Sequence, residues 1–209
     1  MLWLKLLWIF TLPFLGMGMG LIYKGVDRKI AARLQSRFGP PLIQPFLDVR
    51  KLMLKENIVP RDAVKWLFNS MPMLALISTL LLLFYLPLGS ISPVLRGHGD
   101  LIVILYLLII PALALVIAGF SSGSPYALVG AQREMVQMMS YEFPLAITFI
   151  GLVWLLTQAG VAYPFSLETL IKNPGWELVG PIGFLGLIIL LLVLIFVMPA
   201  ELGKIPFDV

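Results

Sequence analysis

The chain has 209 residues, of which 60% are hydrophobic and only 12% are charged, and its mean hydropathy is +0.99. Soluble globular domains are about half apolar and about a quarter charged, so this composition excludes a soluble domain and predicts an integral membrane protein. The chain has no cysteine and a single histidine, which excludes disulfides and cysteine-ligated iron–sulfur clusters. The net charge of +4 is concentrated in one loop, which indicates membrane topology rather than binding of nucleic acid.

Five continuous apolar segments predict an all-α membrane protein, because a helix needs about 20 apolar residues to cross a bilayer. A β-barrel would instead show short segments of alternating polarity. Basic residues follow the first segment and no small-residue cleavage site is present, so we expect a retained helix rather than a signal peptide. The transmembrane helices are expected at residues 2–23, 66–88, 100–120, 126–158 and 179–198, the last ending at Pro199, in one polytopic domain over residues 1–209.

The loop over residues 24–65 is the most basic part of the chain, with ten of the fifteen Lys and Arg residues and four acids. Because cytoplasmic loops carry such an excess, we expect this loop and the C-terminus in the cytoplasm and the N-terminus outside, in a multi-pass protein of the cell membrane. The sequence Gly39-Pro40-Pro41 should break any helix before it.

The second half of this loop has apolar residues at helical spacing, with charged residues on the opposite side. This pattern predicts an amphipathic helix at the lipid bilayer interface. Its apolar side would consist of Phe46, Val49, Leu52 and Met53, and its charged side of Asp48, Arg50, Lys51 and Lys55.

A polar stripe occupies the first half of the fourth span. Arg133, Gln137, Ser140 and Tyr141 share one helical face, and Glu134, Tyr141 and Glu142 form an adjoining row. Ionisable groups at membrane depth generally face a protein interior or a watery cavity, which favours a proton relay through Glu142. Pro144 adds a second polar group by removing the hydrogen bond to the Ser140 carbonyl. Alternatively, Arg133 and Glu134 lie at the headgroup level and only anchor the helix.

Other features argue against a metal or nucleotide site. His98 lies between two glycines in a loop, and nothing nearby could complete a metal site, so we interpret it as a solvated loop residue. The sequence contains no Gly-rich phosphate loop and no internal repeat.

Three blocks of sequence in a fixed order resemble one family. They are DRKIAARLQSRFGPPLIQPFLDVRKLMLKE, ALVGAQREMVQMMSYEFPLAI and the terminal AELGKIPFDV. Together they resemble the membrane subunit that links the soluble redox arm to the membrane arm in respiratory complex I and in energy-converting NiFe hydrogenases. The resemblance extends from about Val26 to the end of the chain.

The resemblance implies that the first inner loop docks hydrogenase-like large and small subunits and an iron–sulfur subunit. It also implies antiporter-like membrane subunits as further partners, and iron–sulfur clusters and a NiFe centre in the partners rather than in this chain. The docking residues implied by position are Arg28, Lys29, Arg33, Gln35, Arg37, Gly39, Pro40, Gln44, Pro45, Asp48, Lys51 and Lys55. The ion path implied in the same way consists of Arg133, Glu134, Tyr141, Glu142, Glu201 and Asp208.

Two departures from the family pattern affect this interpretation. Quinone-reducing members have a longer Gly-containing stretch before the QP pair, whereas this chain has the compact GPPLIQP, which is similar to the hydrogenase-type branch. The family also continues beyond PFDV with acidic residues and further transmembrane helices. We therefore expect this chain to lack those helices, which either belong to another polypeptide or are missing from an incomplete chain.

The leading hypothesis is a membrane subunit without redox centres that couples electron transfer in its partners to proton or sodium translocation. The alternatives are an independent secondary transporter and a purely structural anchor. The residues leave open whether the ion is a proton or Na⁺, and whether the terminal acceptor is protons, polysulfide or quinone.

Overall fold

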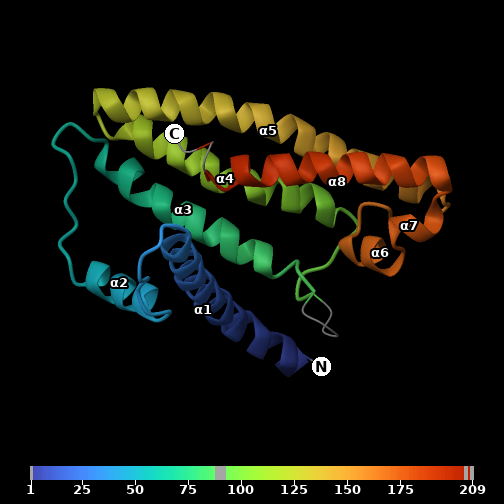
Figure 1. Cartoon of the computed structure of the whole chain (residues 1–209), viewed down its shortest axis with the longest axis horizontal. Helices are drawn as coiled ribbons and strands as arrows, with labels where there is room; N and C mark the ends of the chain where they lie inside the picture. Colours follow the sequence, from blue (N-terminus) through green and yellow to red (C-terminus); the bar gives the residue numbers. More distant parts are fainter. Residues whose placement is uncertain (1, 88–92, 205–206, 208–209) are drawn as a thin grey trace. The chain divides into compact units, whose positions relative to one another are not determined.

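The computed structural model describes residues 2–87, 93–204 and 207, and it forms two compact units, Met1–Ile58 and Val59–Val209. All regular structure in the described residues is helical (Figure 1). Five helices are long and apolar enough to cross a membrane, over Trp8–Leu34, Lys65–Leu83, Asp100–Ser121, Pro125–Gln158 and Pro181–Glu201. The prediction of an all-α membrane protein with about five spans is therefore confirmed.

The first unit contains α1 (Leu2–Leu34) and α2 (Gln44–Met53). Helix α1 does not stop with the apolar segment but continues through the basic residues that follow it. It ends at Leu34, before the Gly-Pro-Pro sequence, because Ser36 takes the left-handed conformation (φ 55°) and the chain closes a Schellman motif. In this motif the Arg37 amide donates to the Ala32 carbonyl at 2.9 Å and the Ser36 amide to the Arg33 carbonyl at 3.0 Å.

The segment between the two helices folds back along α1 at positions that carry small residues. A Cβ atom at Gly39 would lie 3.0 Å from the Cβ of Ala32, and Ala32 is fully buried. A Cβ atom at Gly25 would overlap the backbone of Leu42. The glycines therefore allow the GPPLIQP stretch to lie directly on α1, and α2 begins with Pro45 in its first turn, where its missing amide proton costs nothing.

The second unit is built on four long helices: α3 (Lys65–Leu83), α4 (Asp100–Ser121), α5 (Pro125–Gln158) and α8 (Pro181–Glu201). Helix α4 packs between α3 and α5, and α8 packs along α5 (Figure 1). Where α4 crosses α5, a Cβ atom at Gly119 of α4 would lie 2.8 Å from the Cβ of Ala131 of α5. Small residues allow such close approach of membrane helices.

Two short helices, α6 (Leu167–Lys172) and α7 (Gly175–Leu178), lie in the connection between α5 and α8 that the sequence pattern treats only as a loop. The last span also differs from its expected end, because α8 continues through Pro199 to Glu201. It closes with a second Schellman motif, in which Gly203 has a φ of 56° and the Lys204 amide donates to the Pro199 carbonyl at 3.0 Å. The proline thus lies within the last turn of the helix.

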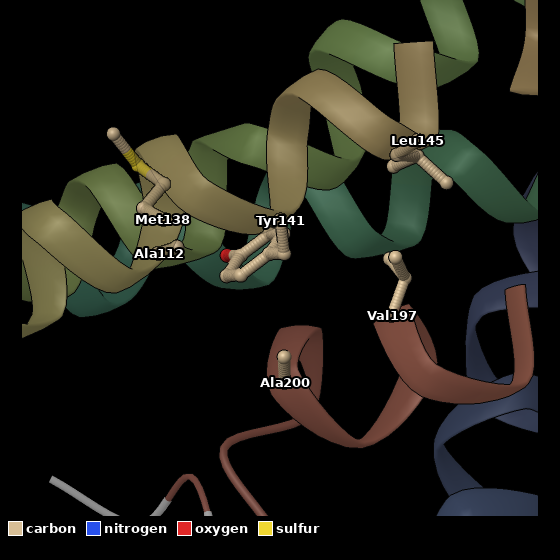
Figure 2. Packing of buried hydrophobic residues seen from close by; sticks show 6 residues of the cluster. All are labelled: Ala112, Met138, Tyr141, Leu145, Val197 and Ala200. Atoms are coloured by element: carbon tan, nitrogen blue, oxygen red, sulfur yellow. The ribbon is translucent and has the colours of Figure 1, made fainter. Parts of the chain in front are cut away.

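A buried cluster joins α4, α5 and α8. Its members are Ala112, Met138, Tyr141, Leu145, Val197 and Ala200, and partly buried Leu108, Ile109, Phe149, Val193 and Leu194 pack around it. In Figure 2 the Tyr141 ring lies on the side of α5 that faces α8, and Val197 and Ala200 project from the facing side of α8. The core of this unit therefore contains one residue of the predicted ion path, and this residue is held by apolar neighbours on three helices.

Candidate functional site

Four residues of the predicted ion path lie around this core. Glu134, Tyr141 and Glu142 come from α5, and Glu201 is the last residue of α8. Tyr141 is 5% exposed, and each of the three glutamates is partly buried. Tyr141 packs in one buried cluster with Ala200, the residue before Glu201, so the end of α8 brings Glu201 to the side of α5 that carries Tyr141. We call these four residues the Tyr141 cluster. Helical spacing places the α5 residues together, whereas the addition of Glu201 depends on the packing of α8 against α5.

The hydroxyl of Tyr141 is buried and makes no hydrogen bond to any described residue. Leaving a buried polar group unsatisfied costs on the order of 1–3 kcal/mol, so few native positions tolerate it, and those that do often belong to a functional site. A phenol can both donate and accept a hydrogen bond, which suits a group between carboxyls that exchange a proton. The packing of α8 on α5 therefore places acidic groups of both helices near a buried phenol, which makes no hydrogen bond to any of those described.

The expected polar face of α5 is divided in the structure. Arg133 and Ser140 are exposed, and the Ser140 hydroxyl donates to the carbonyl of Val136 in its own helix at 2.8 Å. At about 3.6 residues per turn, these two residues lie at one edge of the stripe, whereas Tyr141 and Glu134 face the packed side. Among the described residues, Arg133 forms no ion pair with the glutamates of the predicted ion path.

Gln137 is the residue of the stripe whose role the sequence does not reveal. Its side-chain amide donates to the backbone carbonyl of Ala200 at 3.3 Å and to that of Phe207 at 3.0 Å. These partners are 63 and 70 residues away in the chain. A polar residue on a face shared with Tyr141 is the only signal in the sequence, and it does not identify the partners. Asp208, the last residue of the predicted path, lies outside the described residues.

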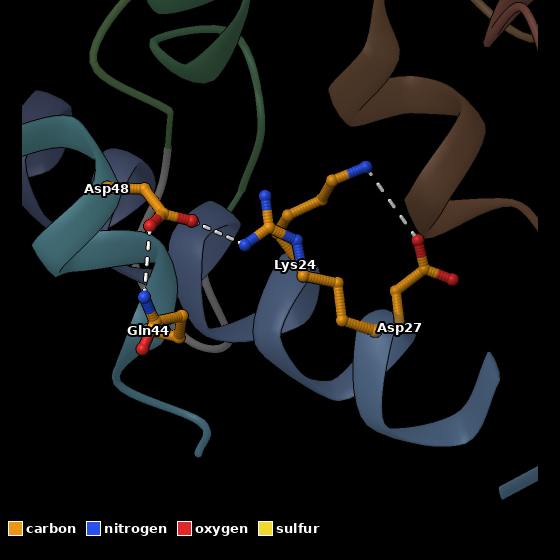
Figure 3. Close-up of polar contacts among 5 residues, drawn as sticks. Lys24, Asp27, Gln44 and Asp48 are labelled. Carbon is orange, nitrogen blue, oxygen red and sulfur yellow. Dashed lines mark hydrogen bonds and ion pairs between the residues drawn. The ribbon is translucent and has the colours of Figure 1, made fainter. Parts of the chain in front are cut away.

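The predicted docking loop is held together by one ion pair between its helices. A guanidinium nitrogen of Arg28 in α1 lies 2.5 Å from a carboxylate oxygen of Asp48 in α2, and the Gln44 amide donates to the other oxygen at 3.1 Å. Hydrogen bonds from Arg28 and then Gln44 hold the pKa of Asp48 below its ordinary value. Figure 3 shows these contacts beside the longer pair of Lys24 and Asp27, 3.9 Å apart within α1.

The other predicted docking residues differ in how far they are accessible. Arg33, Gln35, Arg37, Lys51 and Lys55 are exposed, Lys29, Gly39 and Pro40 are partly buried, and Pro45 is buried. Large apolar side chains are also exposed in this basic region. Phe38 is fully exposed and Leu54 and Ile58 are more than 80% exposed, as are Leu34 and Met53. Apolar side chains among basic ones are typical of a surface that contacts a protein or a membrane.

Helix α2 confirms the predicted amphipathic helix of the loop. All four residues expected on its apolar side are exposed in this chain, from Phe46 at 37% to Met53 at 81%. The charged side is fixed to α1 through Asp48. The helix therefore presents its apolar side away from its own unit.

A second polar group joins the connection between α5 and α8 to the loop before α4, and the sequence pattern does not reveal this contact of Glu168 with Arg96. Glu168 accepts a hydrogen bond from Lys172 at 2.7 Å and pairs with Arg96 at 3.7 Å, and these cations hold its pKa below the ordinary value. The ring of His98 stacks on Tyr163 with centroids 4.0 Å apart. These residues line a cavity of about 410 Å³. In the described part of the chain, no three His, Asp or Glu side chains are grouped as a metal site would require.

Comparison with known proteins identifies the family. A family model described as NADH dehydrogenase matches residues 6–209. The chain belongs to this family. Among its relatives, Hydrogenase-4 component C of Escherichia coli (strain K12) is 34% identical over 189 residues, which cover 90% of this chain and 56% of that protein. A subunit of the NADH-quinone oxidoreductase of Dehalococcoides mccartyi is 28% identical over 196 residues, which cover 90% of this chain and 52% of the relative.

A solved structure shows the same fold in a related chain. The structure of the membrane-bound sulfane sulfur reductase, described as an archaeal respiratory membrane complex, contains a chain that matches with a TM-score of 0.77 and 33% identity. The match covers 98% of this chain and 63% of that one. The resemblance in the three sequence blocks is thus confirmed. The chain spans about half the length of the curated relatives that it matches.

Proposed function

We propose that this chain is a membrane subunit that docks the soluble redox arm of a respiratory-type oxidoreductase and couples electron transfer to ion translocation. The observation that carries the proposal is the Tyr141 cluster, in which partly buried carboxyls of α5 and α8 accompany a buried hydroxyl at the packed junction of the two helices. Ionisable groups in membrane-spanning helices are costly and generally serve ion pathways. The family supports this assignment, because the relatives are components of hydrogenase and NADH-quinone oxidoreductase complexes.

The docking surface in this proposal is the loop over residues 24–65. Its rigid part is the α1–α2 corner that Arg28 and Asp48 tie together, and its exposed basic and apolar residues would contact the partner. Such a combination of apolar contact and surrounding charge is common in protein interfaces. In this proposal the loop and the C-terminus are cytoplasmic and the N-terminus lies outside, in accordance with the excess of basic residues in the loop.

The partners in this proposal are hydrogenase-like large and small subunits, an iron–sulfur subunit and antiporter-like membrane subunits. The redox centres, iron–sulfur clusters and a NiFe centre, would then be theirs. The compact GPPLIQP stretch, folded onto α1 at Gly25 and Gly39, supports the hydrogenase-type branch, as does the 33% identity to the sulfane sulfur reductase chain. The translocated ion is a proton or Na⁺.

The mechanism of coupling would be electrostatic. A change of charge at the docked redox arm would alter proton occupancy of the nearest acids, and the Tyr141 cluster would pass this change along α5 toward α8. A buried, low-dielectric setting strengthens such interactions between charges. Glu142 and Glu201 would carry the exchangeable charge, and Tyr141 would connect them.

The test is the substitution Glu142→Gln in the intact complex, isolated from native membranes and reconstituted into vesicles. We expect the partner subunits to copurify as before and electron transfer to continue, whereas ion uptake per electron is lost. Glu177→Gln, at an exposed position in α7 that makes no ion pair described in the structure, is the matched control. Full ion uptake by the Glu142→Gln complex would support a structural anchor instead, and a chain that purifies alone and takes up a solute would support a transporter.

A further inference from the structure

The α5–α8 junction carries a feature that the proposed function does not yet use. Gln137 of α5 donates both hydrogens of its amide nitrogen across the junction, one to the carbonyl of Ala200 in the last turn of α8 and one to that of Phe207 beyond it. The last carbonyls of a helix have no partner within the helix. The Ala200 carbonyl already accepts the Gly203 amide at 3.2 Å in the Schellman motif, so Gln137 adds a second donor to it from another helix and also binds the carbonyl of Phe207.

The position of Gln137 along α5 links this contact to the Tyr141 cluster. Gln137 lies three residues after Glu134 and four residues before Tyr141, so it is adjacent to both on the helix surface. On the α8 side, its acceptor Ala200 immediately precedes Glu201. The two hydrogen bonds are thus made between the same stretches of α5 and α8 that carry the four members of the cluster.

The apolar packing at this place does not fix the end of α8 by itself. Val197 and Ala200 are small and face Tyr141, whereas Met198 and Leu202 are 57% and 66% exposed (Figure 2). Small side chains specify the spacing of two helices but resist sliding and rotation less than a hydrogen bond of fixed geometry. Within the described residues, the side-chain hydrogen bonds between α5 and the end of α8 are those of Gln137.

We infer that Gln137 is a positioning residue that clamps the last turn of α8, and Phe207 beyond it, onto α5, and so keeps Glu201 beside Tyr141. The inference rests on the proposed function for its effect on ion translocation, but the clamp itself is a structural property. Gln137 transfers no proton in this scheme. It fixes the distance over which a proton or a charge change must pass between the helices.

The substitution Gln137→Met tests the clamp, because methionine has a similar length and shape and lacks the donors. Spin labels are attached to cysteines introduced at the exposed positions Val129 and Leu202, since the chain has no cysteine of its own. The distance between them is measured in the full chain in lipid nanodiscs. We expect a narrow distribution in the parent and a broader or shifted one in Gln137→Met. Ser140→Ala, which removes a hydroxyl bonded only within α5, is the matched control and should leave the distribution unchanged.

The functional consequence is measured separately in the reconstituted complex. We expect Gln137→Met to lower ion uptake per electron at least several-fold while the rate of electron transfer and the set of copurifying subunits stay as in the parent. An unchanged distance distribution in Gln137→Met overturns the clamp. A changed distribution with full ion uptake overturns its role in positioning Glu201. Absence of electron-driven uptake in the parent complex would contradict the proposed function and leave the distance measurement to decide the clamp alone.

Discussion

The carboxylate of Asp48 in α2 forms an ion pair with the guanidinium of Arg28 in α1, although the two residues are 20 positions apart in the sequence. The nitrogen and oxygen atoms of the pair are 2.5 Å apart. This pair is the ionic contact described between the two helices of the docking loop. The Gln44 amide, one turn before Asp48, occupies the other carboxylate oxygen. The α2 helix is therefore tied to α1 on its charged side, which leaves its apolar side free for contact.

The first prediction concerns the pH dependence of this corner. The pKa of Asp48 is lowered in the folded chain, so its stabilising contribution is fully present above the ordinary value of about 4 and is lost as the pH falls below it toward the folded value. We expect the protection of the α2 amides, relative to their intrinsic exchange rate at each pH, to be independent of this group between about pH 8 and 5 and to fall in more acidic buffer.

The substitution Asp48→Asn should remove this acid dependence and raise exchange of the α2 amides at neutral pH, because an amide cannot form the ion pair. The measurement is hydrogen exchange followed by mass spectrometry of the full chain in nanodiscs. Glu56→Gln is the control, since Glu56 is exposed and makes no ion pair described in the structure. Equal protection of α2 in Asp48→Asn and the parent would show that the pair does not hold the corner.

The second prediction concerns the fold-back of the GPPLIQP stretch. Gly25→Ala places a Cβ atom in the space taken by the Leu42 carbonyl, and since this neighbour is backbone, the whole segment has to move. Overpacking of this kind typically costs about 1–3 kcal/mol. We expect lower thermal stability of the first unit and faster proteolysis of residues 38–43.

The matched control for Gly25→Ala lies in the same helix. A Cβ atom at Gly20 would meet nothing within 4 Å, so Gly20→Ala should be neutral or should stabilise α1 by up to about 1 kcal/mol. Proteolysis of both variants under the same conditions separates the steric effect from the change in helix propensity. If both glycines tolerate alanine equally, the segment does not lie on α1 as described.

The sequence was sufficient for the number and type of the long helices, because runs of apolar residues leave no other structure for a membrane. It could not predict their ends. The α1 helix ends at Leu34, where the left-handed Ser36 closes a Schellman motif ahead of Gly39, and α8 continues through Pro199. Such closures depend on the backbone conformation of one residue.

The candidate site was predictable only in part, for a similar reason. Spacing along α5 brings Glu134 and Tyr141 onto one side and Arg133 to its edge, but it does not indicate which part of this face is packed, and Arg133 is exposed. The contact of Gln137 with Phe207 joins residues 70 positions apart and depends on tertiary packing alone. The pair of Glu168 and Lys172, four residues apart, carries a readable signal, whereas the pairing of Glu168 with Arg96 does not.

The third prediction concerns the polar group between α6 and the loop before α4. Glu168 binds both Lys172 and Arg96, and its pKa is lowered, so both pairs persist at neutral pH. We expect Glu168→Gln to increase hydrogen exchange in residues 94–99, which lose their ionic contact with α6. Glu177→Gln in the neighbouring α7 should have no such effect. High salt should reproduce part of the change in the parent, because the cations of both pairs are more than half exposed and their ion pairs are therefore screened. If exchange in residues 94–99 of the parent does not depend on salt, the pairs do not restrain this loop.

The fourth prediction separates the structural and functional roles of Tyr141. Its hydroxyl is buried without a partner among the described residues, so Tyr141→Phe removes an unsatisfied group and keeps the ring that packs in the core. We expect the free energy of unfolding to stay the same or to rise by about 1 kcal/mol. If the hydroxyl connects the carboxyls of α5 and α8, ion uptake per electron should fall in the same variant although the fold is intact. Tyr106→Phe, at a 63% exposed position in α4, is the control and should change neither property. Retained stability together with full ion uptake in Tyr141→Phe would remove the hydroxyl from the path and leave the glutamates to pass the charge without it.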